Sequence, residues 1–559
     1  MLFNSFEFIL LFLPITLAVF FGLGSLKYYR LAIVWLVCAS LFFYGYWNPA
    51  YLYLMIGSIL FNYGTGRVLQ RLSRDSKPDA DAGDGAIALE NIALEDIALE
   101  ENRPANIQRL EGLNDSVKEG DEKKPGFSRG SLFFLVGGIA VNLVILGYYK
   151  YANFFVDNLN AIADFDLQLK TIVLPLAISF FTFQQIAYLV DVYQKKIVNS
   201  DFLDYCLFVT FFPQLIAGPI VHHQEMMPQF KQPAIFSPNI NAMTVGVTLF
   251  VMGLCKKVAI ADTLAQYANP VFDAALKSQS LSFGDAWMGS LAYTFQLYFD
   301  FSGYADMSIG IAQLFGLTLP LNFFSPYKSV SIIEFWRRWH MTLSRFLRDY
   351  LYIPLGGNRQ GNLRRYVNLM ITMVIGGLWH GAGWTFIFWG FLHGFYLAAN
   401  HLWRTFLKHT HRLKPAAQLS PWKTIGAIAL TFFSIHISWV FFRAESFDAA
   451  LSMLATMFGL GGLDWSLTAR LIPVLNDPYS MSPFVMLGVA AALVFLSPNT
   501  YEIMRHEQPA FETYKVSSSI HSGRLQWHPT SRWAIATSLL IGVTILHLFQ
   551  TSEFLYFDF

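Results

Sequence analysis

The chain has 559 residues, of which 54% are hydrophobic, 17% aromatic and 14% charged, and its formal net charge is +1. So few charged residues cannot cover the surface of a soluble protein of this length, and the even charge balance argues against a nucleic-acid-binding protein. The composition therefore indicates an integral membrane protein, with lipids as its surroundings.

Apolar stretches long enough to cross a membrane recur along the chain. A bilayer core of about 30 Å needs roughly 20 apolar residues per helical span. Clear spans are predicted at residues 8–26, 31–47, 50–66, 131–149, 241–260, 384–403, 424–442, 482–497 and 533–550. With the shorter apolar segments between them, we expect an all-α polytopic membrane protein with about 10–13 transmembrane helices.

The distribution of basic residues predicts the orientation of the first spans. No basic residue precedes the first span, as a secretion signal would require, so we expect this span to be retained. Lys27 and Arg30 follow it, and Arg67, Arg71 and Arg74 follow the third span. Because positive loops stay in the cytoplasm, both loops are expected there, with the N-terminus outside.

Residues 71–130 interrupt the apolar pattern. They hold 14 of the 38 carboxylates and 9 of the 39 basic residues, a composition typical of a disordered, solvated insert. Residues 86–100 repeat the unit Xaa-Ile-Ala-Leu-Glu three times, and a period of five fits neither a solenoid nor a helical face. The repeat is either an expanded tandem repeat in a tolerant loop or a helix that docks a partner. We thus expect N-terminal transmembrane helices at 1–70, a cytoplasmic insert at 71–130 and a membrane core at 131–559.

His340 lies in a basic, aromatic segment that is predicted to be one amphipathic helix. Ser331 and Glu334 have the spacing of a capping box, which predicts that the helix begins there. At 100° per residue His340 shares an apolar side with Trp336, Leu343 and Leu347, whereas Arg338 and Arg345 lie opposite. We therefore expect an interfacial helix whose arginines reach phosphates or the cytoplasm and whose His340 faces the protein interior.

His380 follows an apolar run that is short for a membrane span. The 14 residues from Tyr366 to Trp379 would cover only about 21 Å as a helix. The glycines at 376, 377, 381 and 383 offer places to break it, and irregular backbone at membrane depth must be surrounded by protein or line a cavity. His380 is expected at the wall of such a cavity.

Two histidines inside an apolar chain suggest proton chemistry, because imidazole can accept a hydroxyl proton near neutral pH. Acyl transfer from a thioester or ester to an alcohol is the natural reaction for such a base. A structural, hydrogen-bonded role stays open for both His340 and His380 on the residues alone. The sequence contains no motif of a zinc hydrolase, a serine hydrolase or a P-loop ATPase.

The other histidines are weaker candidates for a functional role. His222 and His223 are adjacent, and adjacent side chains diverge on most backbones, so no metal site is predicted. His393, His401 and His436 follow apolar helical patterns and are expected to be packed and hydrogen-bonded.

Two further polar features each have two interpretations. Asp300 and Asp306 follow an aromatic run, and they either pair with an interior arginine or take part in catalysis, because lone charge in hydrocarbon is costly. Asn358 and Arg359 end a Gly-Gly loop. That loop is either a plain turn or a site for the phosphate of a donor.

These segments together resemble the membrane-bound O-acyltransferase (MBOAT) family, and within it the bacterial branch of alginate O-acetyltransferase membrane subunits. The resemblance rests on the arginine-rich His340 segment, on Trp-His-Gly at 379–381, and on further motifs in family order. These motifs lie at 174–184, 211–219, 298–306, 352–359, 439–445 and 552–559. The acidic insert lies outside all of them.

The resemblance implies a ring of helices around a thinned centre, with funnels from both membrane faces. It implies that His380 is the catalytic residue and His340 a second essential histidine. It further implies an inner-membrane enzyme that binds no cofactor and takes an acyl group from a cytoplasmic thioester, acetyl-CoA or an acyl carrier. The acceptor would be an exopolysaccharide such as alginate, often reached through a separate periplasmic acetyltransferase.

Three other functions stay open at this point. The acceptor could be peptidoglycan or another cell-wall glycan, or the enzyme could transfer D-alanine to teichoic acid. A transporter without covalent chemistry would also have many spans and interior charges, but transporters often contain repeated halves. The Trp-His-Gly and Arg-Trp-His patterns each occur once in the sequence.

Overall fold

The computed structural model describes residues 1–75, 129–163, 166–170, 172–197, 200–410, 420–468, 472, 475, 481–511, 525–548 and 555. Most of the predicted insert, residues 76–128, lies outside the described residues, and with it the predictions of disorder and of a role for its repeat. The described part is helical except for two short parallel strands, β1 (Leu319–Pro320) and β2 (Ala510–Phe511). The expectation of an all-α protein is confirmed.

Helices follow one another closely along the first half of the chain, and η denotes a short π- or 3₁₀-helix. In order they are η1 (Glu7–Phe12), α1 (Leu13–Ser25), α2 (Tyr29–Gly45), α3 (Ala50–Asp75), α5 (Arg129–Leu146), η2 (Gly147–Tyr151), α6 (Ala152–Ala163), α7 (Ile178–Tyr193), α8 (Phe202–Thr210), α9 (Phe212–Leu215), α10 (His223–Phe230), η3 (Pro233–Phe236), α11 (Ile240–Cys255), η4 (Lys256–Ala261) and α12 (Asp262–Leu276).

The second half contains the longest helix and the elements that carry the motif histidines. In order these elements are α13 (Phe283–Leu314), β1, η5 (Pro326–Lys328), α14 (Ile332–Trp336), α15 (Met341–Leu347), η6 (Arg348–Tyr352), α16 (Gly361–His380), α17 (Trp384–His409), α18 (Pro421–Arg443), α19 (Phe447–Met457), α20 (Pro483–Phe495), α21 (Thr500–Ile503), η9 (Arg505–Glu507), β2 and α22 (Ser531–His547).

Every span predicted from the sequence coincides with a helical stretch. Among the described residues, four stretches are long and apolar enough to cross a membrane, at Glu7–Ser25, Arg129–Ala163, Ile240–Leu276 and Pro421–Arg443. The predicted spans at 31–47, 482–497 and 533–550 correspond to the shorter apolar helices α2, α20 and α22. The molecule is a polytopic helical membrane protein.

The centre of the core is α13, whose side chains are almost all buried. It packs against α11 through glycines. A Cβ atom on Gly246 would come within 2.6 Å of the Gly310 carbonyl oxygen, and one on Gly253 within 2.5 Å of that of Gly303. Small residues let two apolar helices approach this closely, and the resulting van der Waals contact holds them together within a membrane.

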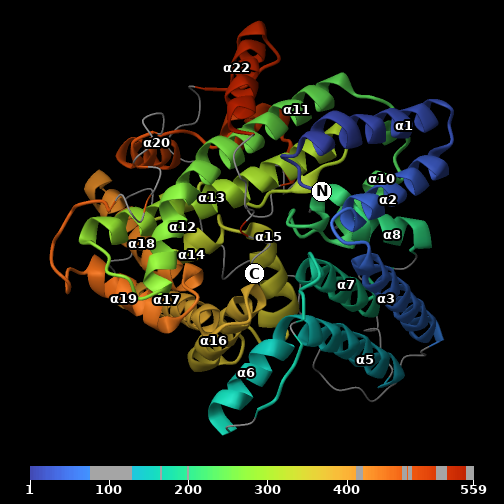
Figure 1. The fold of residues 1–559 in the computed structure, drawn as a ribbon. Helices are drawn as coiled ribbons and strands as arrows, with labels where there is room; N and C mark the ends of the chain where they lie inside the picture. Colours follow the sequence, from blue (N-terminus) through green and yellow to red (C-terminus); the bar gives the residue numbers. More distant parts are fainter. Residues whose placement is uncertain are drawn as a thin grey trace.

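Figure 1 shows two groups of helices. Helices α1, α2, α3, α5 and α7 lie on one side of the molecule, and α17 to α19 lie on the other, with α15 near the centre. Helices α16 and α17 pack against each other along a hairpin, while α7 packs against α3 and α5. Of the two motif histidines, His340 immediately precedes α15 and His380 is the last residue of α16.

Candidate active site

The predicted helix around His340 is two short helices. α14 begins after Ser331, whose Oγ atom accepts a hydrogen bond from the Glu334 amide at 3.3 Å, so the predicted start is confirmed. The prediction of one continuous helix was wrong, because α14 ends at Trp336 and α15 begins at Met341. His340 lies between them in the left-handed region, with φ 42° and ψ 53°. Such a conformation is costly for a residue with a Cβ atom, and it persists only where its surroundings hold it.

The imidazole of His340 is 1% exposed and is oriented by Asn322. Its Nδ1 atom lies 3.1 Å from Asn322 Oδ1, which also accepts hydrogen bonds from the amide and the hydroxyl of Thr342. Because the Thr342 amide can only donate, the atom facing it must be the carbonyl oxygen of Asn322. His340 therefore donates through Nδ1–H, and its Nε2 atom keeps a lone pair able to accept a proton.

His380 is the last residue of α16. This helix has 20 residues and is therefore about 30 Å long. The expectation of a helix of 14 residues, too short to cross a membrane, was wrong. The predicted break at Gly381 and Gly383 is confirmed, since α17 begins at Trp384. Gly376 and Gly377 do not break the helix, contrary to expectation. A Cβ atom on Gly377 would lie 2.2 Å from the Phe386 carbonyl oxygen, so this glycine lets α17 pack against α16.

Trp379 brings the two histidines to one place. Its ring centroid lies 6.3 Å from that of His340 and 4.9 Å from that of His380. The His380 ring also contacts Trp389 and Phe442, each with centroids 5.2 Å away and near-perpendicular rings. His380 is 5% exposed. The site is thus an aromatic enclosure in which two imidazoles from different elements lie near one indole.

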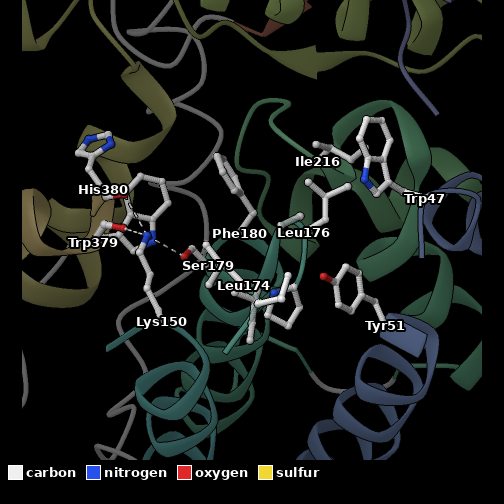
Figure 2. A pocket seen from close by; sticks show the side chains of 14 residues that line it. Trp47, Tyr51, Lys150, Leu174, Leu176, Ser179, Phe180, Ile216, Trp379 and His380 are labelled. Carbon is white, nitrogen blue, oxygen red and sulfur yellow. Dashed lines mark hydrogen bonds between the residues drawn. The ribbon is translucent and has the colours of Figure 1, made fainter. Parts of the chain in front are cut away.

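A cavity of about 190 Å³ reaches this enclosure. Its wall includes His380 and Trp379 at one end and Trp47 and Tyr51 at the other (Figure 2). Between them the non-helical residues 173–177, which precede α7, line the cavity. Trp47 is 56% exposed, so the cavity joins the buried histidine to the surface between α2 and α3. The expectation that His380 lies at a cavity wall is confirmed.

Lys150 belongs to this site and was missed by the sequence reasoning. Its Nζ atom donates hydrogen bonds to the main-chain oxygens of Trp379 at 2.5 Å and His380 at 3.0 Å, and to Ser179 Oγ at 3.4 Å (Figure 2). The neighbouring Tyr151 hydroxyl donates to the Leu378 carbonyl oxygen at 2.7 Å. The position of this lysine at the end of an apolar span is a sequence signal of a functional or structural site, because charge inside a membrane is costly and needs a partner.

The arginines near His340 do not all reach water as predicted. Arg338 is 5% exposed, and its guanidinium contacts the Glu334 carboxylate at 2.7 Å. Arg345 binds both oxygens of Glu225 on α10, at 2.5 and 3.0 Å. The prediction that the arginines reach phosphates or the cytoplasm was wrong for Arg338 and Arg345, because Arg338 pairs with Glu334 four residues earlier and Arg345 pairs with a carboxylate that α10 supplies.

Asp300 and Asp306 pair with lysines, and the expected arginine partner was wrong. Lys257 contacts Asp300 at 2.9 Å and Asp262 at 2.6 Å, and Lys256 contacts Asp306 at 2.6 Å. Both lysines come from η4 in the middle of the α11–α12 stretch. The two carboxylates lie on α13 and are outside the residues that line the His380 cavity, so the structural interpretation fits them better than the catalytic one.

The remaining histidines are placed as follows. His393 bonds to Trp336 and Ser438, and His436 bonds to Thr294 and Ser290; both are packed and hydrogen-bonded as predicted. His401 contacts Arg365. His222 lies 3.1 Å from the Tyr350 hydroxyl, whereas the His223 ring packs on Tyr188 and Phe208, so the adjacent pair diverges.

Asn358 and Arg359 lie in the turn before α16, at the opposite end of this helix from His380. Gly356 and Gly357 in the same turn have φ angles of 105° and 54°, which only glycine adopts without strain. The helix length places the turn about 30 Å from His380, so the structure does not bring these two residues to the cavity.

Comparison with known proteins adds the family. The model of the membrane-bound O-acyltransferase family, MBOAT, matches residues 169–442. A peptidoglycan O-acetyltransferase of Helicobacter pylori is 39% identical over 100% of this chain and 98% of its own length. A probable alginate O-acetylase AlgI of Pseudomonas putida is 36% identical over 100% of both chains. A teichoic acid D-alanyltransferase of Streptococcus thermophilus is 28% identical over 48% of this chain and 68% of its own length.

The matched region contains His340, His380 and Phe442 but begins after Lys150. Relatives that are more than 30% identical to this chain over its full length share its fold and its class of protein. The buried histidines, their shared tryptophan and the cavity that reaches His380 therefore belong to an enzyme, and the chain is a member of the membrane-bound O-acyltransferase family.

Proposed function

We propose that this enzyme is a bacterial inner-membrane O-acetyltransferase that moves acetyl groups from a cytoplasmic thioester to the hydroxyls of an extracytoplasmic glycan. The observation that carries the proposal is that His340 and His380 both pack on Trp379 at the buried end of a cavity. His380 is proposed as the catalytic base and His340 as its companion. The donor is acetyl-CoA or an acylated carrier protein, which is a co-substrate.

The proposed reaction needs a base and a dry site. The attacking hydroxyl belongs either to the glycan or to the partner that passes the acetyl group on to it. Its oxygen forms a bond with the thioester carbonyl carbon, the C–S bond breaks, and the sulfur leaves as a thiol that takes up the hydroxyl's proton through the imidazole. Positioned proton transfer of this kind contributes about 10²–10⁴-fold to the rate. The aromatic rings of Trp379, Trp389 and Phe442 around His380 exclude water, which protects the thioester from hydrolysis.

The basic residues suggest which end of the cavity faces the acceptor. The loop between α1 and α2 carries Lys27, and the second half of α3 carries Arg67 and Arg71, so these ends belong in the cytoplasm by the positive-inside rule. The turn between α2 and α3, which carries Trp47, then lies on the extracytoplasmic side. In this orientation the cavity leads from the acceptor side inward to His380.

A site for the donor phosphate is proposed at the other end of α16. The turn with Asn358 and Arg359 precedes a helix whose first two turns carry Arg364 and Arg365. Basic residues there favour both the cytoplasmic side and a phosphate.

Two acceptors are supported by different observations. An alginate-like exopolysaccharide is the first, because the full-length AlgI relative is matched from end to end. Peptidoglycan is the second, because a full-length peptidoglycan O-acetyltransferase is 39% identical to this chain. With either acceptor, a separate periplasmic acetyltransferase is the proposed partner that carries the acetyl group from this enzyme to the polymer.

The test compares histidine variants in a strain from which the gene has been removed. Wild type, His380→Ala and His340→Ala are each restored to that strain, and their levels in the membrane are measured by immunoblot. Ester-linked acetate is then determined separately on purified exopolysaccharide and on peptidoglycan. Wild type should restore acetate on one of the two polymers, and His380→Ala should not.

His436→Gln is the matched control, because His436 is also buried but bonds to Thr294 and Ser290 away from the cavity. This variant should retain acetylation in proportion to its membrane level. Full acetylation by His380→Ala would overturn the assignment of the base. Acetate missing from both polymers in the wild-type strain would overturn the choice of acceptor.

A further inference from the structure

Lys150 is a partly buried cation at the site, and the proposed reaction gives it no role. It comes from η2, a π-helical segment between α5 and α6 that lies more than two hundred residues before His380 in the chain. A π-helical turn inserted between α-helices often marks a functional site. Here it directs two successive polar side chains, Lys150 and Tyr151, at the end of α16.

The last carbonyl groups of α16 need hydrogen-bond donors from outside the helix. The last four carbonyl groups of an α-helix have no partner within the helix, and when buried they must find one elsewhere. Tyr151 supplies a hydrogen bond to Leu378, and Lys150 supplies one each to Trp379 and His380. Three successive carbonyl groups at the end of α16 are thereby satisfied by two adjacent residues of one segment.

The positive charge of Lys150 also favours its position at the end of α16. Among the described residues no carboxylate forms an ion pair with Lys150. The C-terminus of a helix carries a partial negative charge, which favours a cation placed there. The carbonyl oxygens of α16 therefore take the place of a counter-ion, so the lysine and the helix end stabilise each other.

The consequence concerns His380, which has no helical residue after it to hold its position. The chain turns sharply at Gly381, whose amide is bonded to the Gly377 carbonyl oxygen at a long 3.4 Å. Lys150 bonds directly to the main chain of His380 and, through Ser179, also to the start of α7. The main chain of His380 is thus attached to two neighbouring helices by a single ammonium group.

We infer that Lys150, assisted by Tyr151, is the positioning residue that holds the end of α16 and so sets the place of the His380 imidazole in the aromatic enclosure. This inference rests on the proposed role of His380 as the base. Catalysis is sensitive to such placement, since a shift of about 1 Å in a reacting group can cost about 10²-fold in rate.

The experiment uses the full-length protein purified in detergent micelles. Lys150→Met keeps the length of the side chain but removes its charge and its N–H donors, and Lys150→Arg keeps both. For Lys150→Met we expect kcat to fall about 10²-fold with the KM for the acyl donor changed less than about threefold. Lys150→Arg should recover most of the loss, because a guanidinium still donates to carbonyl oxygens.

Lys328→Met is the matched control. Lys328 Nζ also donates to a main-chain oxygen just beyond a helix end, that of Ser497 after α20, at 2.6 Å, and Lys328 is not among the residues that line the cavity. It should leave kcat unchanged. A loss of kcat as large in Lys328→Met as in Lys150→Met would show a general effect of losing a partly buried lysine and would overturn the inference.

Hydrogen exchange gives a readout that does not depend on activity. In Lys150→Met the amides of residues 378–385 should exchange about tenfold faster or more than in wild type, while those near the start of α16 stay unchanged. Unchanged exchange together with a kcat within threefold of wild type would overturn the inference. Absence of His380-dependent transfer in the wild-type protein would instead overturn the proposed function, and the exchange result would still decide whether Lys150 holds the helix end.

Tyr151→Phe is the second variant that tests the inference if Lys150→Met does not accumulate in the membrane. It removes one hydrogen bond, that to the Leu378 carbonyl oxygen, so we expect kcat to fall about fivefold and exchange to quicken in the same peptide. Wild-type kcat and exchange in this variant would overturn the inference.

Discussion

The Nδ1 atom of His340 lies 3.1 Å from the Oδ1 atom of Asn322, and this one hydrogen bond selects the tautomer of the histidine. Asn322 lies on the segment after β1, and its oxygen is held in place by Thr342 at the start of α15. His340, in its left-handed conformation, lies between the short helices α14 and α15. The geometry leaves Nε2 as the basic nitrogen in a buried site.

Asn322→Ala should therefore have a larger effect on kcat than on the free energy of unfolding. Without the oxygen, His340 is free to change tautomer and orientation, and a displaced group of this kind costs about 10²-fold in rate. The measurement is kcat per folded molecule for acetyl transfer by the purified enzyme.

Thr342→Val is the control for this change. It removes the hydroxyl that bonds to Asn322 and to the Ile220 amide but leaves the bond between Asn322 and His340. It should lower the free energy of unfolding by about 1–3 kcal/mol with kcat nearly unchanged. Equal kcat for Asn322→Ala and wild type would contradict the tautomer argument.

Lys257→Met should destabilise the protein strongly. Lys257 is 3% exposed and binds both Asp300 and Asp262, so its loss leaves two buried carboxylates without their cation. Removing one partner of a buried ion pair costs about 3–5 kcal/mol. Thermal unfolding in detergent measures the effect, and the double variant Lys257→Met/Asp300→Asn should recover part of it. A single variant as stable as wild type would refute the assignment of this cluster as structural.

Gly377→Ala should weaken the packing of α16 against α17. The added methyl group would lie 2.2 Å from the Phe386 carbonyl oxygen, which is main chain and cannot move aside cheaply, and overpacking of this kind costs about 1–3 kcal/mol. Gly376→Ala is the control, because its methyl group would meet only the Leu347 side chain at 3.2 Å. The two variants are compared by thermal unfolding, and equal melting temperatures would count against close packing at Gly377.

Arg359→Ala tests the proposed phosphate site at the start of α16. If this residue binds the donor phosphate, its loss should raise the KM for acetyl-CoA about tenfold with kcat unchanged, because the turn lies about 30 Å from His380 along the helix. Steady-state kinetics with varied acetyl-CoA separates the two constants. A fall in kcat alone would argue for a structural role of the turn.

Deletion of residues 80–125 tests the acidic insert. This segment lies outside the residues matched by the family model, 169–442, and outside the sequence motifs, so we expect near-normal acetylation of the glycan by the shortened protein. Loss of activity at an unchanged membrane level would indicate that the insert docks a partner.

The sequence by itself determined the features that depend on neighbouring residues. Runs of apolar side chains predicted the positions of the helices, because a span must satisfy its own backbone within the bilayer. The glycines at 381 and 383 predicted where α16 ends, and the order of motifs predicted the family. The capping pair Ser331 and Glu334 predicted the start of α14, though not its early end at Trp336.

Only the tertiary structure decided how the site is assembled. The bond that left-handed His340 donates to Asn322, 18 residues earlier, and the attachment of His380 to Lys150, 230 residues earlier, each depend on contacts between separate segments of the chain. The same holds for the lysine partners of Asp300 and Asp306. A buried polar group takes whichever partner the packing of helices brings within hydrogen-bond distance, and a local pattern of residues contains no information about that choice.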